Sequence, residues 1–298
     1  MRVLTYGATG VQGGPVARRL LEAGHEVRAV VRDPGKAAWL EEAGAELTAA
    51  DLADRDKLLA ATRGIDAVFF HLPLVFDMDD GLGYARNAVD AAREAGVDLL
   101  VVNSSGIPPA EPSGYLHLDI KREVDAHIRK TGIPTISLQP SVYMEVLEGT
   151  DVRMGIADHG LVCYPLPESH RISWMSVEDI AALSVAAFER PDLAGSSFKV
   201  GGPEALTGDQ LAEKFSSVLG RPIAYRAVSN PEYADLLRSS AGEIVSHVIA
   251  DHLIHIEEAG VDYLAADDAV AVADELGVQL TRLEDWVAAR DWTVTSVA

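Results

Sequence analysis

The sequence predicts an α/β fold: a doubly wound parallel sheet joined to a smaller, mostly helical C-terminal lobe. Short apolar runs that are typical of buried strands alternate with amphipathic helices over residues 1–140. A glycine-rich turn separates the first apolar run from the first helix. Because such alternation requires crossover connections, we expect neighbouring strands to run parallel, with right-handed crossovers.

The first turn has glycines at three-residue spacing. The apolar run Val3–Thr5 precedes Gly7, Gly10 and Gly13, and apolar residues recur at helical spacing from Val16. Glycines allow a tight turn and a close backbone approach to phosphate, while a helix N-terminus attracts negative charge. We therefore predict a Rossmann-like turn that binds a dinucleotide; a purely structural turn is the alternative. The predicted cofactor-binding residues here are Gly7, Thr9, Gly10, Val11, Gln12 and Gly13.

The second predicted strand, 25–31, ends at a basic residue. In NAD-binding sites, an acidic residue at this strand end binds the ribose hydroxyls, whereas a basic residue suits the 2′-phosphate of NADP. In this sequence the position is occupied by Arg32. Lys36 follows one turn later. Asp33, next to Arg32, is an acidic residue that leaves NAD(H) as the alternative cofactor. Arg32 and Lys36 therefore favour NADP(H) over NAD(H), with a solvated surface arginine as the alternative.

The next elements lead to the predicted ligand crevice. A helix over 35–43, a strand over 45–49 and a further helix precede the strand 67–70. Loops at the carboxyl ends of central strands face bound ligands. We expect these loops to contribute the cofactor-binding residues Asp51, Leu52, His71, Leu72 and Pro73, and the substrate-binding residue Phe76. A structural role for His71 is the alternative.

The helix predicted over 115–125 carries the candidate catalytic pair. His117 and Lys121 are four residues apart and share one helix face. A lysine can orient the nicotinamide ribose, and a histidine can donate a proton near neutral pH; a chance pair on an exposed helix is the alternative. A helix over 84–96 and a strand over 99–102 come before this helix, and Ser104 is a further candidate for the cofactor.

The remainder of the chain defines the predicted domains. A strand over 133–138 feeds Pro140 and Tyr143, both expected at the cofactor. No helix is predicted over 159–170; a strand and helix follow from 172 to 188, another strand covers 198–203, and helices dominate from 206. We expect a dinucleotide-binding domain over 1–145, to which 172–202 returns, and a substrate-binding lobe formed by 146–171 and 203–298.

Composition excludes several classes of function. The 298 residues are 48% hydrophobic and carry a net charge of −21, which repels nucleic acids and anionic membranes. Cys163 is the only cysteine, so no disulfide framework or cysteine-rich metal site is expected. His252 and His255 share a helix face without a clear acidic third ligand, so we predict no metal site. With no signal peptide or membrane span predicted, we expect a cytoplasmic protein.

Motifs along the whole chain resemble the NmrA-like branch of atypical short-chain dehydrogenases/reductases, a branch that includes quinone-reductase-like and isoflavone-reductase-like proteins. The segments that carry this resemblance are Gly7–Gly13, Val31–Pro34, Ala91–Val97, Ser104–Ser105, Gly132–Thr135, Val177–Ala181, Gly201–Thr207 and Leu283–Val287. The resemblance implies an NAD(P)-binding oxidoreductase with a Rossmann-like domain and a substrate lobe, usually using NADP(H). Separately, the excess of arginine over lysine, 19 to 6, suggests a bacterial coding sequence.

The resemblance also shows departures at the site. The superfamily uses a Tyr-xxx-Lys pair, and His117 occupies the tyrosine position, whereas Lys121 resembles the lysine of isoflavone-reductase-like relatives. Gln139 and Val146 stand where relatives often carry arginine and asparagine. Because of these departures, the resemblance does not identify the substrate.

We therefore expect an NADPH-dependent reductase of a small apolar carbonyl, quinone or conjugated substrate. Lys121 would position the ribose, and His117, or a water that it holds, would donate the proton. The expected substrate-binding residues are Phe76, Ser105, Tyr143, Met144, Trp174 and Met175. Two alternatives stay open: an inactive NADP(H) redox sensor that binds a protein partner, and a specialised pathway enzyme that reuses the fold. A small-molecule substrate is expected, and a homodimer is left open.

Overall fold

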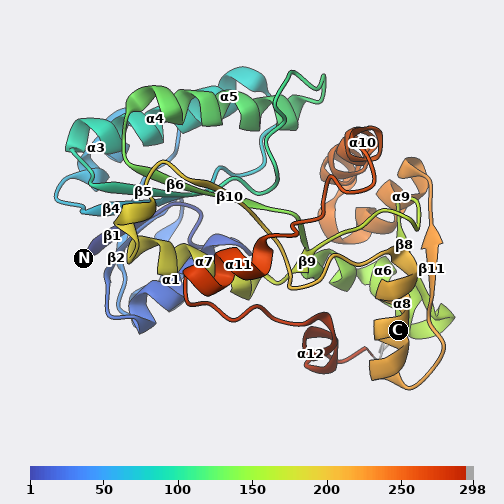
Figure 1. The fold of residues 1–298 in the computed structure, drawn as a ribbon. Helices are drawn as coiled ribbons and strands as arrows, with labels where there is room; N and C mark the ends of the chain where they lie inside the picture. The colour runs from blue at the N-terminus through green and yellow to red at the C-terminus, as the bar shows by residue number, and fades with distance from the viewer. Residues whose placement is uncertain (293–298) are drawn as a thin grey trace. The chain divides into compact units, whose positions relative to one another are not determined.

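The computed structural model describes residues 1–292, apart from the side chain of Asp251, and these residues form two compact units (Figure 1). Unit 1 comprises Met1–Pro140, Val177–Val200 and Ala271–Gln279. Unit 2 comprises Ser141–Ser176, Gly201–Val270 and the chain from Leu280 onward. Each unit has its own buried core, and unit 1 contains the main sheet.

The main sheet has seven parallel strands in the order β10-β6-β5-β4-β1-β2-β3. The strands are β1 (Arg2–Thr5), β2 (Glu26–Val31), β3 (Glu46–Ala49), β4 (Ala67–Phe70), β5 (Leu99–Asn103), β6 (Thr135–Pro140) and β10 (Ser197–Val200). The chain first adds strands on one side of β1 and then, from β4, on the other. This reversal confirms the predicted doubly wound α/β fold. In such folds ligands bind where the strand order reverses, which here is at the carboxyl ends of β1 and β4.

Helices cover both faces of this sheet. Unit 1 holds α1 (Gly13–Glu22), η1 (Pro34–Ala37), α2 (Ala38–Glu42), α3 (Arg55–Thr62), α4 (Met78–Ala95), α5 (Leu116–Thr131), α7 (Val177–Phe188) and η4 (Pro191–Leu193); α11 (Ala269–Glu275) begins in unit 2 and ends in unit 1. Figure 1 shows α3, α4 and α5 on one face and α1 and α7 on the other. Because both faces are covered, all four residues of β4 are buried, as its apolar sequence predicts.

Two helices of unit 1 are longer than the sequence pattern indicates. The helix predicted from residue 84 begins at Met78, because the Asp77 carboxylate accepts a hydrogen bond from the Asp80 N–H at 3.0 Å and caps it. The helix predicted over 115–125 continues to Thr131 and ends at Gly132, whose φ is 73°. Both helices pack on the core that supports the candidate site.

Unit 2 combines two small parallel sheets with helices. The pairs are β7 (Val142–Tyr143) with β9 (Trp174–Met175), and β8 (Leu161–Tyr164) with β11 (Ala224–Ala227). The helices are η2 (Met144–Glu148), α6 (Thr150–Met154), η3 (Gly155–His159), α8 (Gly208–Leu219), α9 (Asn230–Ala241), α10 (Glu243–Ala259) and α12 (Leu283–Ala288). Strands β8 and β11 were not predicted, since each is short and has a single partner strand.

Candidate functional site

The turn between β1 and α1 has the geometry that a bound diphosphate requires. Gly7 has φ of 69°, and its carbonyl accepts a hydrogen bond from the Gly10 N–H at 2.9 Å. A Cβ at Gly13 would lie 2.6 Å from the Gly7 carbonyl carbon, so no side chain fits there. The first turn of α1 contains no acidic residue, and no side chain caps it. The positive end of the α1 helix dipole is therefore not neutralised by a side chain, and it is available to an anion.

The end of β2 presents basic side chains to solvent. Arg32 and Lys36 are exposed, and neither has an ion-pair partner among residues 1–292. The Asp33 carboxylate accepts a hydrogen bond from the Gly35 N–H at 3.1 Å and caps η1. The Asp33 carboxylate is thus oriented toward η1. Arg32 and Lys36 are the charged side chains here that remain available for a ligand.

The loop after β3 is held by local contacts. The Asp51 carboxylate accepts a hydrogen bond from the Ala53 N–H at 2.9 Å. The Leu52 carbonyl accepts one from the side chain of Asn87 at 2.9 Å. Both predicted cofactor-binding residues therefore lie in an ordered turn, with Asp51 exposed.

The ends of β4 and β5 meet the glycine turn. A Cβ at Gly7 would lie 3.3 Å from the His71 ring, and His71 also forms a hydrogen bond with the backbone of Asn103. The Gln12 side chain donates to Ser105 Oγ at 2.8 Å. Unit 1 thus brings together the glycine turn, the end of β4 and the end of β5, which the sequence predicted to face one crevice. Leu72 is half-buried here, while Pro73 and Phe76 are exposed in the loop after β4.

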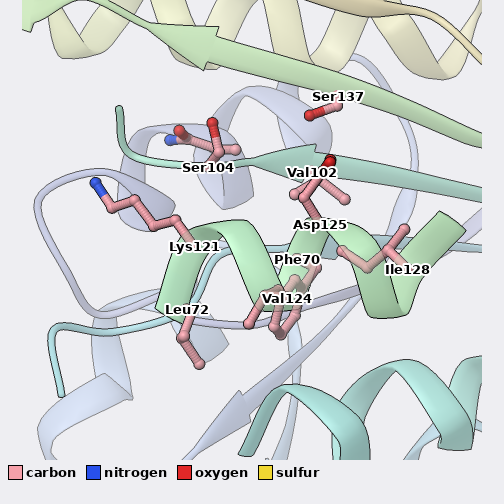
Figure 2. Close-up of a pocket in the computed structure, with 10 residues that line it drawn as sticks. Phe70, Leu72, Val102, Ser104, Lys121, Val124, Asp125, Ile128 and Ser137 are labelled. Carbon is pink, nitrogen blue, oxygen red and sulfur yellow. The ribbon is translucent and has the colours of Figure 1, made fainter. Parts of the chain in front are cut away.

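Lys121 lies at a cavity between α5 and the sheet (Figure 2). The lining residues are Phe70, Leu72, Val102, Asn103, Ser104, Lys121, Val124, Asp125, Ile128 and Ser137. The Lys121 ammonium donates a hydrogen bond to the Ser105 carbonyl. No carboxylate that the structure describes pairs with it. Asp125, one turn along α5, pairs instead with Arg129 at 2.8 Å. The site therefore contains a lysine held by a neutral oxygen, with no acidic partner.

Burial changes the protonation of the three basic side chains at this site. Desolvation lowers the pKa of Lys121 to about 8. Desolvation and the nearby Lys121 charge lower the pKa of His71 to about 4 and that of His117 to about 3. At neutral pH both histidines are therefore neutral, and Lys121 is the group that holds an exchangeable proton.

The remaining predicted site residues have different surroundings. Pro140 ends β6 in unit 1 and is buried. Tyr143 is half-buried in unit 2, whereas Met144, Trp174 and Met175 are at most 2% exposed in the core of that unit. Trp174 packs edge-to-face on Tyr164, with ring centroids 5.1 Å apart. These three buried side chains support unit 2 and present almost no surface that a substrate could reach.

Asn103 is a site residue that the sequence interpretation missed. It ends β5, is 1% exposed, and donates a hydrogen bond to the Gln12 side chain at 2.9 Å. Its own side-chain oxygen accepts from the Ser105 N–H at 2.9 Å. A buried amide side chain must be hydrogen-bonded, so an asparagine at the carboxyl end of a central strand was an available signal.

The described part of the chain contains neither a cluster of metal ligands nor a membrane-spanning helix. No group of three or more histidine, cysteine, aspartate or glutamate side chains is arranged to hold a metal ion. Within the same residues, no helix has both the length and the apolar character that crossing a bilayer requires.

Comparisons with known proteins agree with this geometry. The model of the NmrA-like family matches residues 1–287. The chain is 34% identical to an NAD(P)H azoreductase of Xenophilus azovorans over 76% of this chain and 77% of that protein. It is 32% identical to a (4-alkanoyl-5-oxo-2,5-dihydrofuran-3-yl)methyl phosphate reductase of Streptomyces griseus over 75% and 76%. An NADPH complex of a quinone oxidoreductase from Escherichia coli shares the fold, with a TM-score of 0.80, 22% identity and coverage of 97% and 99%.

The neutral histidines predict a pH-dependent stability. Because folding lowers the pKa of His117 to about 3, an unfolded chain takes up a proton below about pH 6.5 that the folded chain does not. The free energy of unfolding should therefore fall on acidification by about 1.4 kcal/mol per pH unit for this histidine. Urea unfolding at about pH 6 and about pH 5 measures this slope.

His117→Gln should flatten that slope by the contribution of one proton. His247→Gln is the matched control, because His247 is an exposed histidine on α10. Equal slopes for the wild type and His117→Gln would contradict the burial of a neutral His117.

Proposed function

This chain belongs to the NmrA-like family and is an NAD(P)H-dependent oxidoreductase, and we propose that it reduces a small apolar carbonyl, quinone or conjugated substrate with NADPH. The observation that carries the proposal is the position of Lys121, a proton-bearing side chain without an acidic partner at the crevice. Two relatives named for the reduction of an azo compound and of an oxo-dihydrofuran support the choice of substrate class.

The residues of unit 1 fit the parts of the cofactor. The glycine turn would receive the diphosphate, because its helix N-terminus carries no acidic side chain or cap. Arg32 and Lys36 would receive a 2′-phosphate, because together they outweigh the single negative charge of Asp33, whose carboxylate caps η1. When bound, NADPH supplies a hydride from its nicotinamide ring.

Lys121 is the proton donor in this proposal. Its pKa of about 8 keeps the ammonium charged at neutral pH while making proton loss accessible. His117 replaces the usual tyrosine, but its pKa of about 3 leaves it neutral at neutral pH. His117 therefore serves as a hydrogen-bonding neighbour, and the proton that completes substrate reduction comes from Lys121 Nζ.

The substrate would contact exposed or half-buried side chains. Within unit 1, Phe76 is 47% exposed in the loop after β4, and Ser105 is half-buried. Their apolar and hydroxyl surfaces suit a flat, weakly polar substrate with one oxygen or nitrogen acceptor. Phe76 and Ser105 are therefore the substrate-binding candidates of unit 1.

A panel assay tests the proposed function directly. Purified protein with NADPH should oxidise the cofactor in the presence of at least one quinone, azo dye, enone or aromatic ketone, because Lys121 can protonate the reduced product. NADPH absorbance measures the reaction, and calorimetry measures cofactor binding. Tight NADPH binding without turnover on any class would instead favour a redox sensor, the function that a histidine at the tyrosine position also suits.

Removing the lysine should abolish proton donation. Lys121→Ala should lower kcat by about 10²-fold or more, and wild-type turnover should decline above about pH 8 as the ammonium loses its proton. Circular dichroism checks that the fold is retained. Lys57→Ala, which removes an exposed lysine of α3, is the control, and an unchanged kcat in Lys121→Ala would exclude the lysine from the mechanism.

Reversing the charge at the end of β2 should change cofactor choice. Arg32→Asp should weaken NADPH binding by about tenfold or more while affecting NADH much less, because only NADPH carries the 2′-phosphate. Calorimetry with both cofactors measures the ratio. Arg63→Asp makes the same charge change at another exposed position of unit 1; an equal loss for both cofactors in Arg32→Asp would refute the role of Arg32.

A further inference from the structure

A closed ring of hydrogen bonds joins the glycine turn to the end of β5. The Gln12 side chain donates to Ser105 Oγ at 2.8 Å and accepts from the Asn103 side chain at 2.9 Å. The Asn103 side-chain oxygen accepts from the Ser105 N–H at 2.9 Å, which closes the ring. Gln12 is therefore bound to both residues that set the path of the backbone after β5.

This ring holds a strained backbone. Ser105 has φ of 53° and is the only non-glycine residue of 1–292 with a positive φ. Such a conformation costs free energy and persists only where surrounding contacts hold it. Gly106 follows with φ of 135°, and a Cβ there would lie 2.7 Å from Lys121 Nζ. The loop is thus shaped around the lysine ammonium.

The same loop provides the hydrogen bond of Lys121. Its ammonium donates to the Ser105 carbonyl, and no carboxylate of the described residues pairs with it. The titratable groups near it are His71 after β4, His117 on α5 and Asp125 on α5. With the histidines neutral and Asp125 bound to Arg129, the position of one backbone carbonyl decides where the ammonium lies.

We propose that Gln12 is a positioning residue that connects the cofactor-binding turn to Lys121 by holding Ser105 in its strained conformation. The inference rests on the proposed function, because it assigns a task to a lysine that donates a proton. A side chain of the turn expected to receive the diphosphate then also fixes where the ammonium lies. Gln12 acts through Ser105 and need not touch the substrate.

Gln12→Ala tests this connection. We expect kcat to fall by about tenfold to a hundredfold, because the ammonium is displaced, while the Kd for NADPH rises less than about threefold. Side-chain NMR of the lysines, assigned with Lys121→Arg, should show the Lys121 pKa rising from about 8 toward its ordinary 10.5 as water reaches the loop. The titration is measured without cofactor or substrate.

A second variant separates positioning from folding. Ser105→Gly removes the hydroxyl that Gln12 binds, and glycine adopts a positive φ without strain. It should therefore fold readily. Glycine also adopts many other backbone conformations, so without the Gln12 contact the loop is no longer held in place, and the same change in kcat and in the Lys121 titration is expected. Gln210→Ala is the matched control, because Gln210 accepts a hydrogen bond from the Thr207 N–H at 2.9 Å in unit 2. It should alter neither readout.

The outcomes distinguish the two proposals. If the wild type neither binds NADPH nor turns over any substrate, the proposed function fails, whatever the titrations show. If the wild type is active but Gln12→Ala and Ser105→Gly both keep its kcat and its Lys121 titration, the positioning role is overturned. A parallel change in both variants, with Gln210→Ala unaffected, supports it.

Discussion

The contact between two backbone segments at the start of α1 is the constraint on which the site depends. A Cβ at Gly13 would collide with the carbonyl group of Gly7, so α1 can start this close to β1 only with glycine there. Gly7 itself needs a positive φ. This approach directs the N-terminus of α1 at the crevice and brings Gln12 within reach of Asn103. A helix displaced by one side chain would lose both the anion site and the hydrogen-bond ring.

The cavity at Lys121 contains a positive charge, although the protein as a whole carries a net charge of −21. The chain has 46 acidic and 25 basic side chains, yet no acid among residues 1–292 pairs with Lys121. Desolvation lowers the lysine pKa, and the lysine charge in turn helps to keep His71 and His117 neutral. Local positive charge on an otherwise acidic protein suits a negatively charged cofactor, since the surrounding surface repels other polyanions.

Much of unit 1 could be predicted from local patterns. Apolar runs indicated the strands of its sheet, and the glycine spacing indicated the turn, because both depend on neighbours close in sequence. The early start of α4 at Met78 was missed, since its Asp77 cap lies outside the periodic segment. Burial was harder to predict: Trp174 and Met175 have the composition of a substrate pocket, and only the packing of unit 2 shows that they belong to its core.

The sequence by itself determined the α/β class, the glycine turn before α1 and the place of His117 and Lys121 on one helix, because backbone sterics and helical spacing are local properties. Only the tertiary structure decided that Lys121 lacks an acidic partner, that His117 is neutral, and that Asn103 joins Gln12 to Ser105. Those properties arise between residues far apart in the chain. They depend on desolvation and on hydrogen-bond geometry, which exist only once the strands and helices have packed.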